Sequence, residues 1–148
     1  MDDKRVSSSA TVAAPPSVVF EILADPRQHA LIDGSGSVRD LIAGPERLSR
    51  GAEFGVSMKL FGVSYRISNR VVEFEEDRRI AWRHFGGHRW RYELTPTSDG
   101  GTQVIETFDY SRYGTLQTSV IRLLGFPERN RQGIDRTLAR LKQVAESR

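Results

Sequence analysis

The chain has 148 residues, 38% of them hydrophobic and 28% charged, which is typical of one globular domain with its own core, expected to span residues 1–148. It contains no cysteine, which excludes disulfides, thiolate nucleophiles and zinc–thiolate sites. The net charge of +3 is small, and the arginines are scattered among Asp and Glu instead of forming a basic stripe, so we expect no nucleic acid as a partner.

Apolar runs are short throughout the chain. None approaches the roughly 20 residues that a membrane-spanning helix needs, so we expect no stable membrane insertion. Residues 1–15 contain no hydrophobic signal core, and together with the lack of cysteine this favours a cytoplasmic location. The pattern indicates no particular oligomeric state.

The first part of the chain predicts a strand followed by two short helices. Residues 5–14 alternate between apolar and polar side chains, as a half-buried strand does. Pro15-Pro16-Ser17 ends this strand and begins a short helix that runs to about Asp25, because proline is favoured in a first helical turn. A second short helix is predicted over residues 27–32, and a short strand over 38–42.

Five further strands are predicted in the middle of the chain, over residues 53–60, 63–71, 79–84, 89–94 and 103–110. Each alternates between apolar and polar positions with period two. This alternation indicates an antiparallel sheet with one covered face and one face in water.

Turn lengths predict how these strands pair, because directly paired residues share a face of the sheet. We expect two-residue turns at Phe61-Gly62 and Glu76-Asp77, and three-residue loops at residues 86–88 and 98–100. The resulting pairs are Leu60 with Val63, Met58 with Tyr65, Phe54 with Asn69, Val71 with Trp82, Asn69 with His84, His84 with Trp90, Trp82 with Tyr92, Tyr92 with Glu106, and Trp90 with Phe108.

The last third of the chain predicts two helices. Residues 115–124 place Leu116, Val120 and Leu123 on one side of a helix. Residues 127–148 read as a long amphipathic helix whose apolar stripe is Ile134, Leu138, Leu141 and Ala145. Such a helix needs a broad apolar surface, which the sheet supplies, and we expect a binding cavity between the two.

The covered face of the sheet carries more polar and aromatic groups than an ordinary core. A mainly apolar lining with a few polar groups is typical of a small-molecule cavity. The residues predicted to line it are Met58, Tyr65, Asn69, Trp82, His84, Trp90, Tyr92, Glu106, Phe108 and Tyr110 from the sheet, with Ile134, Leu138 and Leu141 from the last helix.

Glu106 and His84 are the candidate acid/base residues. A buried carboxylate needs a partner, so Glu106 either accepts a hydrogen bond from Tyr92 or pairs with an arginine, or else it anchors a ligand hydroxyl or acts as a general base. His84 is either a core histidine or a proton shuttle. His29 and Asp33 are assigned to a solvated loop, with a pocket mouth as the alternative.

The remaining motifs point to no cofactor and no metal. His88 is assigned to a loop tip, and the three histidines lack any close ligand spacing. The glycines at 34 and 36 are not followed by the Gly-Lys-Ser/Thr of a phosphate loop. No serine lies in a nucleophile elbow.

Three stretches resemble a known family. Residues 11–26, TVAAPPSVVFEILADP, resemble the opening strand–helix motif of the polyketide cyclase/dehydrase and lipid-transport group, and Trp82-Arg83 with residues 90–94 resembles its central strands. The chain is therefore similar to the START/Bet v1-like (SRPBCC) helix-grip superfamily. Many relatives place a Trp shortly after the second short helix, where this chain has ALIDG at residues 30–34, so its pocket entrance is expected to differ.

The resemblance implies an α+β helix-grip fold, a curved seven-stranded antiparallel sheet wrapped around a long C-terminal helix with two short helices after the first strand. The leading functional hypothesis is binding of a small, mainly apolar ligand that is aromatic, polyketide-like or lipid-like. One alternative is a cofactor-free cyclase or dehydratase using Glu106 or His84 as acid/base. Another is a protein-interaction module, using residues 115–126 or the basic outer face.

Overall fold

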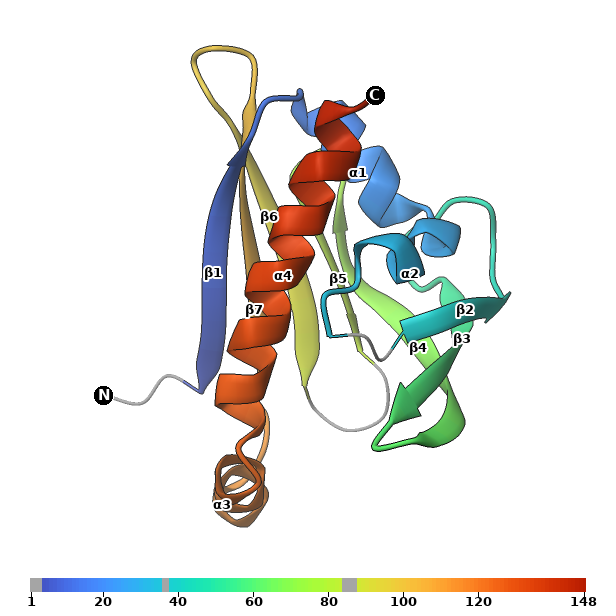
Figure 1. Cartoon of the computed structure of the whole chain (residues 1–148), viewed down its shortest axis with the longest axis vertical. Coiled ribbons are helices and arrows are strands. Elements are labelled where there is room, and N and C mark those ends of the chain that lie inside the picture. The colour runs from blue at the N-terminus through green and yellow to red at the C-terminus, as the bar shows by residue number, and fades with distance from the viewer. Residues whose placement is uncertain (1–3, 36–37, 84–87) are drawn as a thin grey trace.

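The computed structural model describes residues 4–35, 38–83 and 88–148 (Figure 1). The elements, in chain order, are β1 (Arg5–Val12), α1 (Pro16–Ala24), the 3-10 turn η1 (Pro26–Gln28), α2 (His29–Ile32), β2 (Val38–Ala43), β3 (Glu53–Leu60), β4 (Val63–Glu75), β5 (Arg79–Arg83), β6 (Arg89–Pro96), β7 (Thr102–Asp109), α3 (Thr115–Leu123) and α4 (Phe126–Glu146). The described strands form one seven-stranded sheet in the order β1-β7-β6-β5-β4-β3-β2, with every neighbouring pair antiparallel.

The sheet curves around the long helix, as the α+β helix-grip prediction requires. Figure 1 shows α4 running along one face of the sheet, with α1 and α2 beside it. The helix packs on β1 and β7 and also contacts α1, α2 and α3. The predicted stripe of Ile134, Leu138, Leu141 and Ala145 is buried, which confirms the amphipathic assignment.

Two of the predicted strand registers are confirmed. In the β3–β4 hairpin, Leu60 pairs with Val63, Met58 with Tyr65, and Phe54 with Asn69. Between β6 and β7, Tyr92 pairs with Glu106 and Trp90 with Phe108. The covered and solvated faces therefore lie where the alternation places them.

The predicted turn between β4 and β5 is wrong, although Val71 does pair with Trp82. Glu73 pairs with Ala81, so Val72 is an extra residue in β4 and forms a bulge. The loop is consequently one residue longer than expected and places Asp77 in a left-handed conformation with φ of 61°. The bulge shifts the phase of the alternation, so that the inward positions change from odd-numbered Val71 to even-numbered Phe74. The adjacent apolar residues Val71 and Val72 are its trace in the sequence.

The predicted register between β5 and β6 is also wrong. Trp82 pairs with Trp90 instead of Tyr92, and Tyr92 pairs with Ile80. The shift is two residues, which leaves every side chain on its predicted face because the strand period is two. The pairs predicted for His84 lie outside the described residues.

The arginines of the central strands pair with acids on the outer face of the sheet. Arg91 donates to Glu73 at 2.9 Å and to Asp109 at 3.2 Å, and Arg89 donates to Glu73 at 2.8 Å. Burial alone would raise the pKa of Asp109, but hydrogen bonds from Ser111 and Arg91 more than offset it and hold that pKa well below its usual value. This network joins β4, β6 and β7 behind the covered face.

The segment after α2 packs directly on α4. The Gly34 N–H donates to Thr137 Oγ1 at 2.7 Å, and Arg140 donates to the Asp33 carbonyl. A Cβ atom at Gly34 would overlap the α4 backbone at Arg136 and Thr137, so only glycine allows this approach. Among the helices of the described ranges, none is long and apolar enough to cross a membrane.

Candidate ligand-binding cavity

A cavity of about 580 Å³ lies between the sheet and the N-terminal half of α4. This volume lies within the range of small-molecule sites. Its lining comprises His29, Ile32, Asp33, Ser35, Val38, Phe54, Val56, Met58, Tyr65, Ile67, Asn69, Trp82, His88, Trp90, Tyr92, Glu106, Phe108, Tyr113, Ile121, Phe126, Arg129, Asn130, Gln132, Gly133, Ile134, Arg136 and Thr137.

The structure brings most of the predicted site residues together around this cavity. Those in the lining are Met58, Tyr65, Asn69, Trp82, Trp90, Tyr92, Glu106, Phe108 and Ile134. Tyr110, Leu138 and Leu141 are buried but lie outside the lining. His84 lies outside the described residues. The ligand-binding role of each of these residues stays a prediction.

Stacked aromatic rings build the wall on the sheet side. The Trp82 ring lies between His29, whose ring stacks on it at 4.5 Å with an interplanar angle of 18°, and Tyr92 at 5.6 Å. Phe54 meets both His29 and Trp82 edge-on. Because Trp82 and Trp90 are paired across β5 and β6, this aromatic wall extends along the sheet to Phe108, 4.8 Å from the Trp90 ring. Such rings offer a broad apolar contact surface.

The assignment of His29 to a solvated loop is wrong. His29 is only 6% exposed, and its Nε2 donates to the Leu23 carbonyl at 2.8 Å, which leaves Nδ1 unprotonated in the neutral ring. Burial lowers the pKa of His29, so the ring is neutral at pH 7. The buried residues Pro26, His29 and Ile32 recur every three positions, and this spacing is the signal that indicates an inward helical face.

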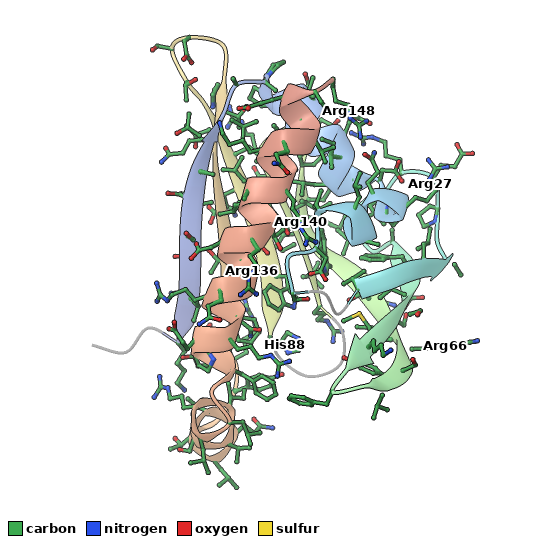
Figure 2. The ribbon with its side chains drawn as sticks, in the orientation of Figure 1. Arg27, Arg66, His88, Arg136, Arg140 and Arg148 are labelled. Atoms are coloured by element: carbon green, nitrogen blue, oxygen red, sulfur yellow. The ribbon has the colours of Figure 1, made fainter. Side chains whose placement is uncertain are left out.

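The assignments of Asp33 and His88 to solvent change as well. Asp33 is half-buried, lines the cavity, and accepts a hydrogen bond from the Val38 N–H at 3.0 Å. His88, labelled in Figure 2, lines the cavity instead of occupying a loop tip. Its Nδ1 lies 2.7 Å from the Tyr113 hydroxyl. Burial lowers the pKa of His88 to about 4.

Glu106 is the most unusual group in the cavity. Its side chain is on β7, 3% exposed, and hydrogen-bonded to the Tyr92 hydroxyl. Burial raises the pKa of Glu106 well above its usual value, Tyr92 partly offsets this effect, and the charges of Asp33 and Asp135 raise the pKa further. Burial therefore favours the protonated, neutral form of Glu106, and Tyr92, whose pKa is also raised by burial, keeps its proton.

One oxygen of Glu106 has no hydrogen-bond partner. Oε1 is buried and unpartnered among the residues that the structure describes. Tyr92 is a donor, so the acid proton is best placed on the oxygen that does not accept from it. A buried polar atom left without a partner costs about 1–3 kcal/mol, which a ligand oxygen within reach would recover.

The N-terminal part of α4 contributes lining residues that the sequence reasoning missed. Phe126, Asn130, Gly133 and Thr137 all line the cavity. They lie on both sides of Ile134 along the helix at steps of three and four, so the helical period itself marks them. Asn130 escaped notice because the apolar stripe was traced through apolar residues only.

Metal binding finds no support in the described ranges, where no group of three His, Asp or Glu side chains is arranged to hold an ion. The cavity instead combines aromatic rings with the titratable side chains of His29, Asp33, His88 and Glu106. The arrangement suits apolar contact plus one or two hydrogen bonds, and the neutral Glu106 is the group that can also release a proton.

Comparisons with known proteins agree with this architecture. A protein of Mycobacterium tuberculosis H37Rv, "Uncharacterized protein Rv0088", is 44% identical over 147 residues, which cover 97% of this chain, and the chain spans 66% of that protein's length. Protein NE0264 of Nitrosomonas europaea has a similar fold, with a TM-score of 0.70 and 19% identity over 99% of this chain and 97% of its own.

A third relative carries a family description in its name. The Polyketide_cyc-like protein Cgl2372 of Corynebacterium glutamicum has a TM-score of 0.65 and 18% identity over 98% of this chain and 93% of its own. Residues 3–146 match the family described as "Polyketide cyclase / dehydrase and lipid transport". With nearly its whole length matched and the helix-grip fold in place, the chain belongs to the polyketide cyclase/dehydrase and lipid-transport family.

Proposed function

We propose that this protein binds a small, mainly apolar ligand in the cavity between the sheet and α4, and that the ligand carries a hydroxyl or carbonyl oxygen. The single observation that carries the proposal is the unpartnered Oε1 of Glu106 in the lining of a cavity of about 580 Å³. A hydrophobic ligand-binding role also fits the family description.

The aromatic wall supports the apolar part of the proposal. Trp82, Trp90 and Phe108 present ring surfaces to the cavity, and Met58 and Ile134 complete its apolar lining. A ligand in contact with this wall gains roughly 25 cal/mol for each Å² of apolar surface removed from water. This gain is independent of the detailed ligand shape, so the wall favours a class of ligands instead of one compound.

The Glu106–Tyr92 pair supports the polar part. A neutral carboxylic acid donates one hydrogen bond from its O–H and accepts others, so it pairs equally well with a hydroxyl or a carbonyl of the ligand. A site that holds an unsatisfied polar group discriminates against ligands that lack a partner for it. The ligand oxygen is thus the main source of selectivity.

The experiment uses a matched pair of probes, 2-naphthol and 2-methylnaphthalene, whose affinities are measured by displacement of a fluorescent apolar dye. We expect wild type to prefer 2-naphthol by about fivefold, the value of one net hydrogen bond. Glu106→Leu should abolish the preference. Glu106→Gln, which keeps a donor and an acceptor at the same place, should retain most of it.

Equal affinities of wild type for the two probes, or an unchanged preference in Glu106→Leu, would contradict the polar role of Glu106. Failure of both probes to displace the dye would contradict the binding proposal itself. Native mass spectrometry of the purified protein beside a denatured control complements this experiment, because a small molecule lost on denaturation reveals the chemistry of the natural ligand.

An enzymatic role is the second candidate, and the raised pKa of Glu106 is the observation that favours it. A carboxylic acid whose pKa is raised by burial in a mainly apolar cavity is suited to act as a general acid. In a cofactor-free cyclisation or dehydration, Glu106 would donate its proton to the departing or enolising oxygen of the substrate. Turnover by Glu106→Gln separates the two candidates. The variant should keep its ligand affinity in either case, but an enzyme of this kind should lose turnover.

A further inference from the structure

Helix α3 carries its apolar side chains on the outside. Leu116, Val120 and Leu123 follow the i, i+4, i+7 spacing of one helical stripe and are 78%, 47% and 85% exposed. The buried residue of the helix is Thr118. A helix that only covers a core has the opposite arrangement, and a contiguous exposed apolar stripe marks an interaction surface.

The tip of the β3–β4 hairpin has the same character. Phe61 and Val63 flank the turn at Gly62 and are 78% and 64% exposed. Figure 1 shows this hairpin and α3 at the same end of the molecule. The Arg129 guanidinium at the start of α4 lies 4.5 Å from the Phe61 ring centroid, so the hairpin tip is next to the α3–α4 corner.

Both segments border the cavity. Ile121 of α3, Phe126 and Arg129 of α4, and Tyr65 of β4 belong to its lining. The exposed apolar residues therefore frame the cavity at this end, and we call them the mouth surface: Phe61, Val63, Leu116, Val120, Leu123 and Leu124.

The charge around the mouth surface has one sign in both segments. Residues 54–72 and 110–127 contain no Asp or Glu, and their basic residues are Lys59, Arg66, Arg70, Arg112 and Arg122. Of these, Arg70 pairs with Glu53 and Arg112 with Asp109. Arg66 projects outward from the hairpin (Figure 2). On α4 the next residues mix Glu128 with Arg129 and Arg131, so the uniformly basic part coincides with the apolar part.

We propose that the mouth surface docks on an anionic lipid bilayer. Apolar side chains on one face of a helix, with basic residues around them, bind the headgroup region by burying the apolar groups while the cations pair with acidic lipids. The apolar residues come from two segments of the chain. The charged residues within both segments are all basic, which matches an anionic headgroup layer.

Docking of this kind is peripheral and leaves the fold unchanged. It turns the cavity opening toward the lipid, so that an apolar ligand can pass between bilayer and cavity without crossing water. The docking itself does not depend on the ligand proposal, because the mouth surface consists of residues outside the Glu106–Tyr92 pair.

The first test is vesicle flotation of the intact protein. We use vesicles of phosphatidylcholine alone and of phosphatidylcholine with about 30% phosphatidylglycerol, the anionic lipid that the basic residues would recognise. We expect binding to the anionic vesicles that weakens as salt is added, and little binding to the neutral ones. No binding to either vesicle, or equal and salt-independent binding to both, would overturn the proposal.

The second test removes the apolar contribution. The double variant Leu116→Ser/Leu123→Ser should bind anionic vesicles at least about tenfold more weakly, because each buried leucine contributes a large part of the interfacial affinity. The control is Leu31→Ser, since Leu31 is also an exposed leucine at 56% but belongs to α2, away from α3. Equal binding by the double variant and the control would contradict the proposal.

The third test reverses charge at the hairpin. Lys59→Glu/Arg66→Glu should abolish the preference for anionic vesicles, whereas Arg50→Glu should not. Arg50 is exposed just before β3, at the end of the strand opposite the hairpin tip. An unchanged circular dichroism spectrum and thermal unfolding transition in all variants show that they are folded. A dimer in sedimentation velocity that Leu116→Ser/Leu123→Ser dissociates would assign the surface to a second copy of the chain and overturn the lipid proposal.

Discussion

At the scale of single residues, the cavity is governed by one buried acid. Within the described ranges no cation pairs with Glu106, and the arginines of β6 pair with Glu73 and Asp109 on the opposite face of the sheet. Desolvation without a compensating charge favours the neutral form, so the proton stays on the carboxyl in the folded state. The folded and unfolded chains therefore bind different numbers of protons near neutral pH.

This difference predicts that Glu106→Gln stabilises the protein increasingly as pH rises. Above the pKa of an unfolded glutamate, the unfolded chain is ionised while native Glu106 keeps its proton, so wild-type stability falls with pH until the raised native pKa is passed. Gln has no such dependence. The free-energy difference between variant and wild type should grow by up to about 1.4 kcal/mol per pH unit within that window.

Urea unfolding between about pH 5 and pH 8 measures this difference. Glu46→Gln in an exposed loop serves as the control. A Glu106→Gln difference that stays constant with pH would mean that native Glu106 is ionised, and it would also remove the basis for a general-acid role.

The face of the sheet on which a side chain lies was predictable from the sequence, because the period of two in a strand determines it. Trp82, Tyr92 and Glu106 reach the covered face because alternate residues of a strand share a side, and an error of two residues in pairing leaves that result intact. His29 was not predictable in the same way. Its polar ring suggests solvent, and its burial depends on stacking with Trp82, more than fifty residues away in the chain.

At the scale of elements, the contact between the loop after α2 and α4 positions one side of the cavity. Gly34 lies against α4 there, and Gly133 of α4 lies against Ser35 of the loop. The two positions differ in whether they have space for a Cβ atom. A Cβ at Gly34 would overlap the α4 backbone, whereas a Cβ at Gly133 would lie 3.6 Å from the Ser35 Cβ, an ordinary packing distance. The two glycines therefore provide a matched pair of substitutions.

We predict that Gly34→Ala lowers the free energy of unfolding by about 1–3 kcal/mol, because overpacking forces the loop off the helix. Gly133→Ala should raise it by about 0.5–1 kcal/mol, since alanine is the better helix former and space is available. Chemical denaturation of both variants beside wild type measures the two effects. If both substitutions had the same sign, the loop would not rest on α4 as described.

Elements were predictable in type and less so in their connections. The strands, the paired short helices and the long helix follow from periodicity and proline positions. The β5–β6 pairing did not follow, because loops that differ by two residues satisfy the same alternation and both place Trp82 and Trp90 inside. For α3, the period gives an apolar side but not whether another element covers it, and the structure leaves that side exposed.

At the scale of the whole molecule, the curved sheet and α4 meet closely at one end and separate at the other. Ile134, Leu138, Leu141 and Ala145 close the core, whereas the lining around Val56, Phe126 and Asn130 leaves the cavity open. An unfilled cavity costs stability through lost contacts. A cavity that lowers stability in this way is expected in a protein that binds a ligand there. An interaction module would instead be expected to fill its interior with its own side chains.

The cavity predicts a contrast between two buried valines on distant strands of the same covered face. Val56 of β3 lines the cavity at 3% exposure, and Val104 of β7 is 0% exposed and lies outside the lining. Val56→Phe should cost little stability, because the larger ring enters empty space, and should weaken 2-naphthol binding severalfold. Val104→Phe should lower the free energy of unfolding by about 1–3 kcal/mol, because no space exists there, and should leave the affinity of the folded protein unchanged.

Thermal unfolding measures the effect of both substitutions on stability, and dye displacement measures their effect on 2-naphthol binding. Equal destabilisation by the two substitutions, with unchanged binding, would indicate that the sheet closes on α4 in solution and that the interior is filled by its own side chains.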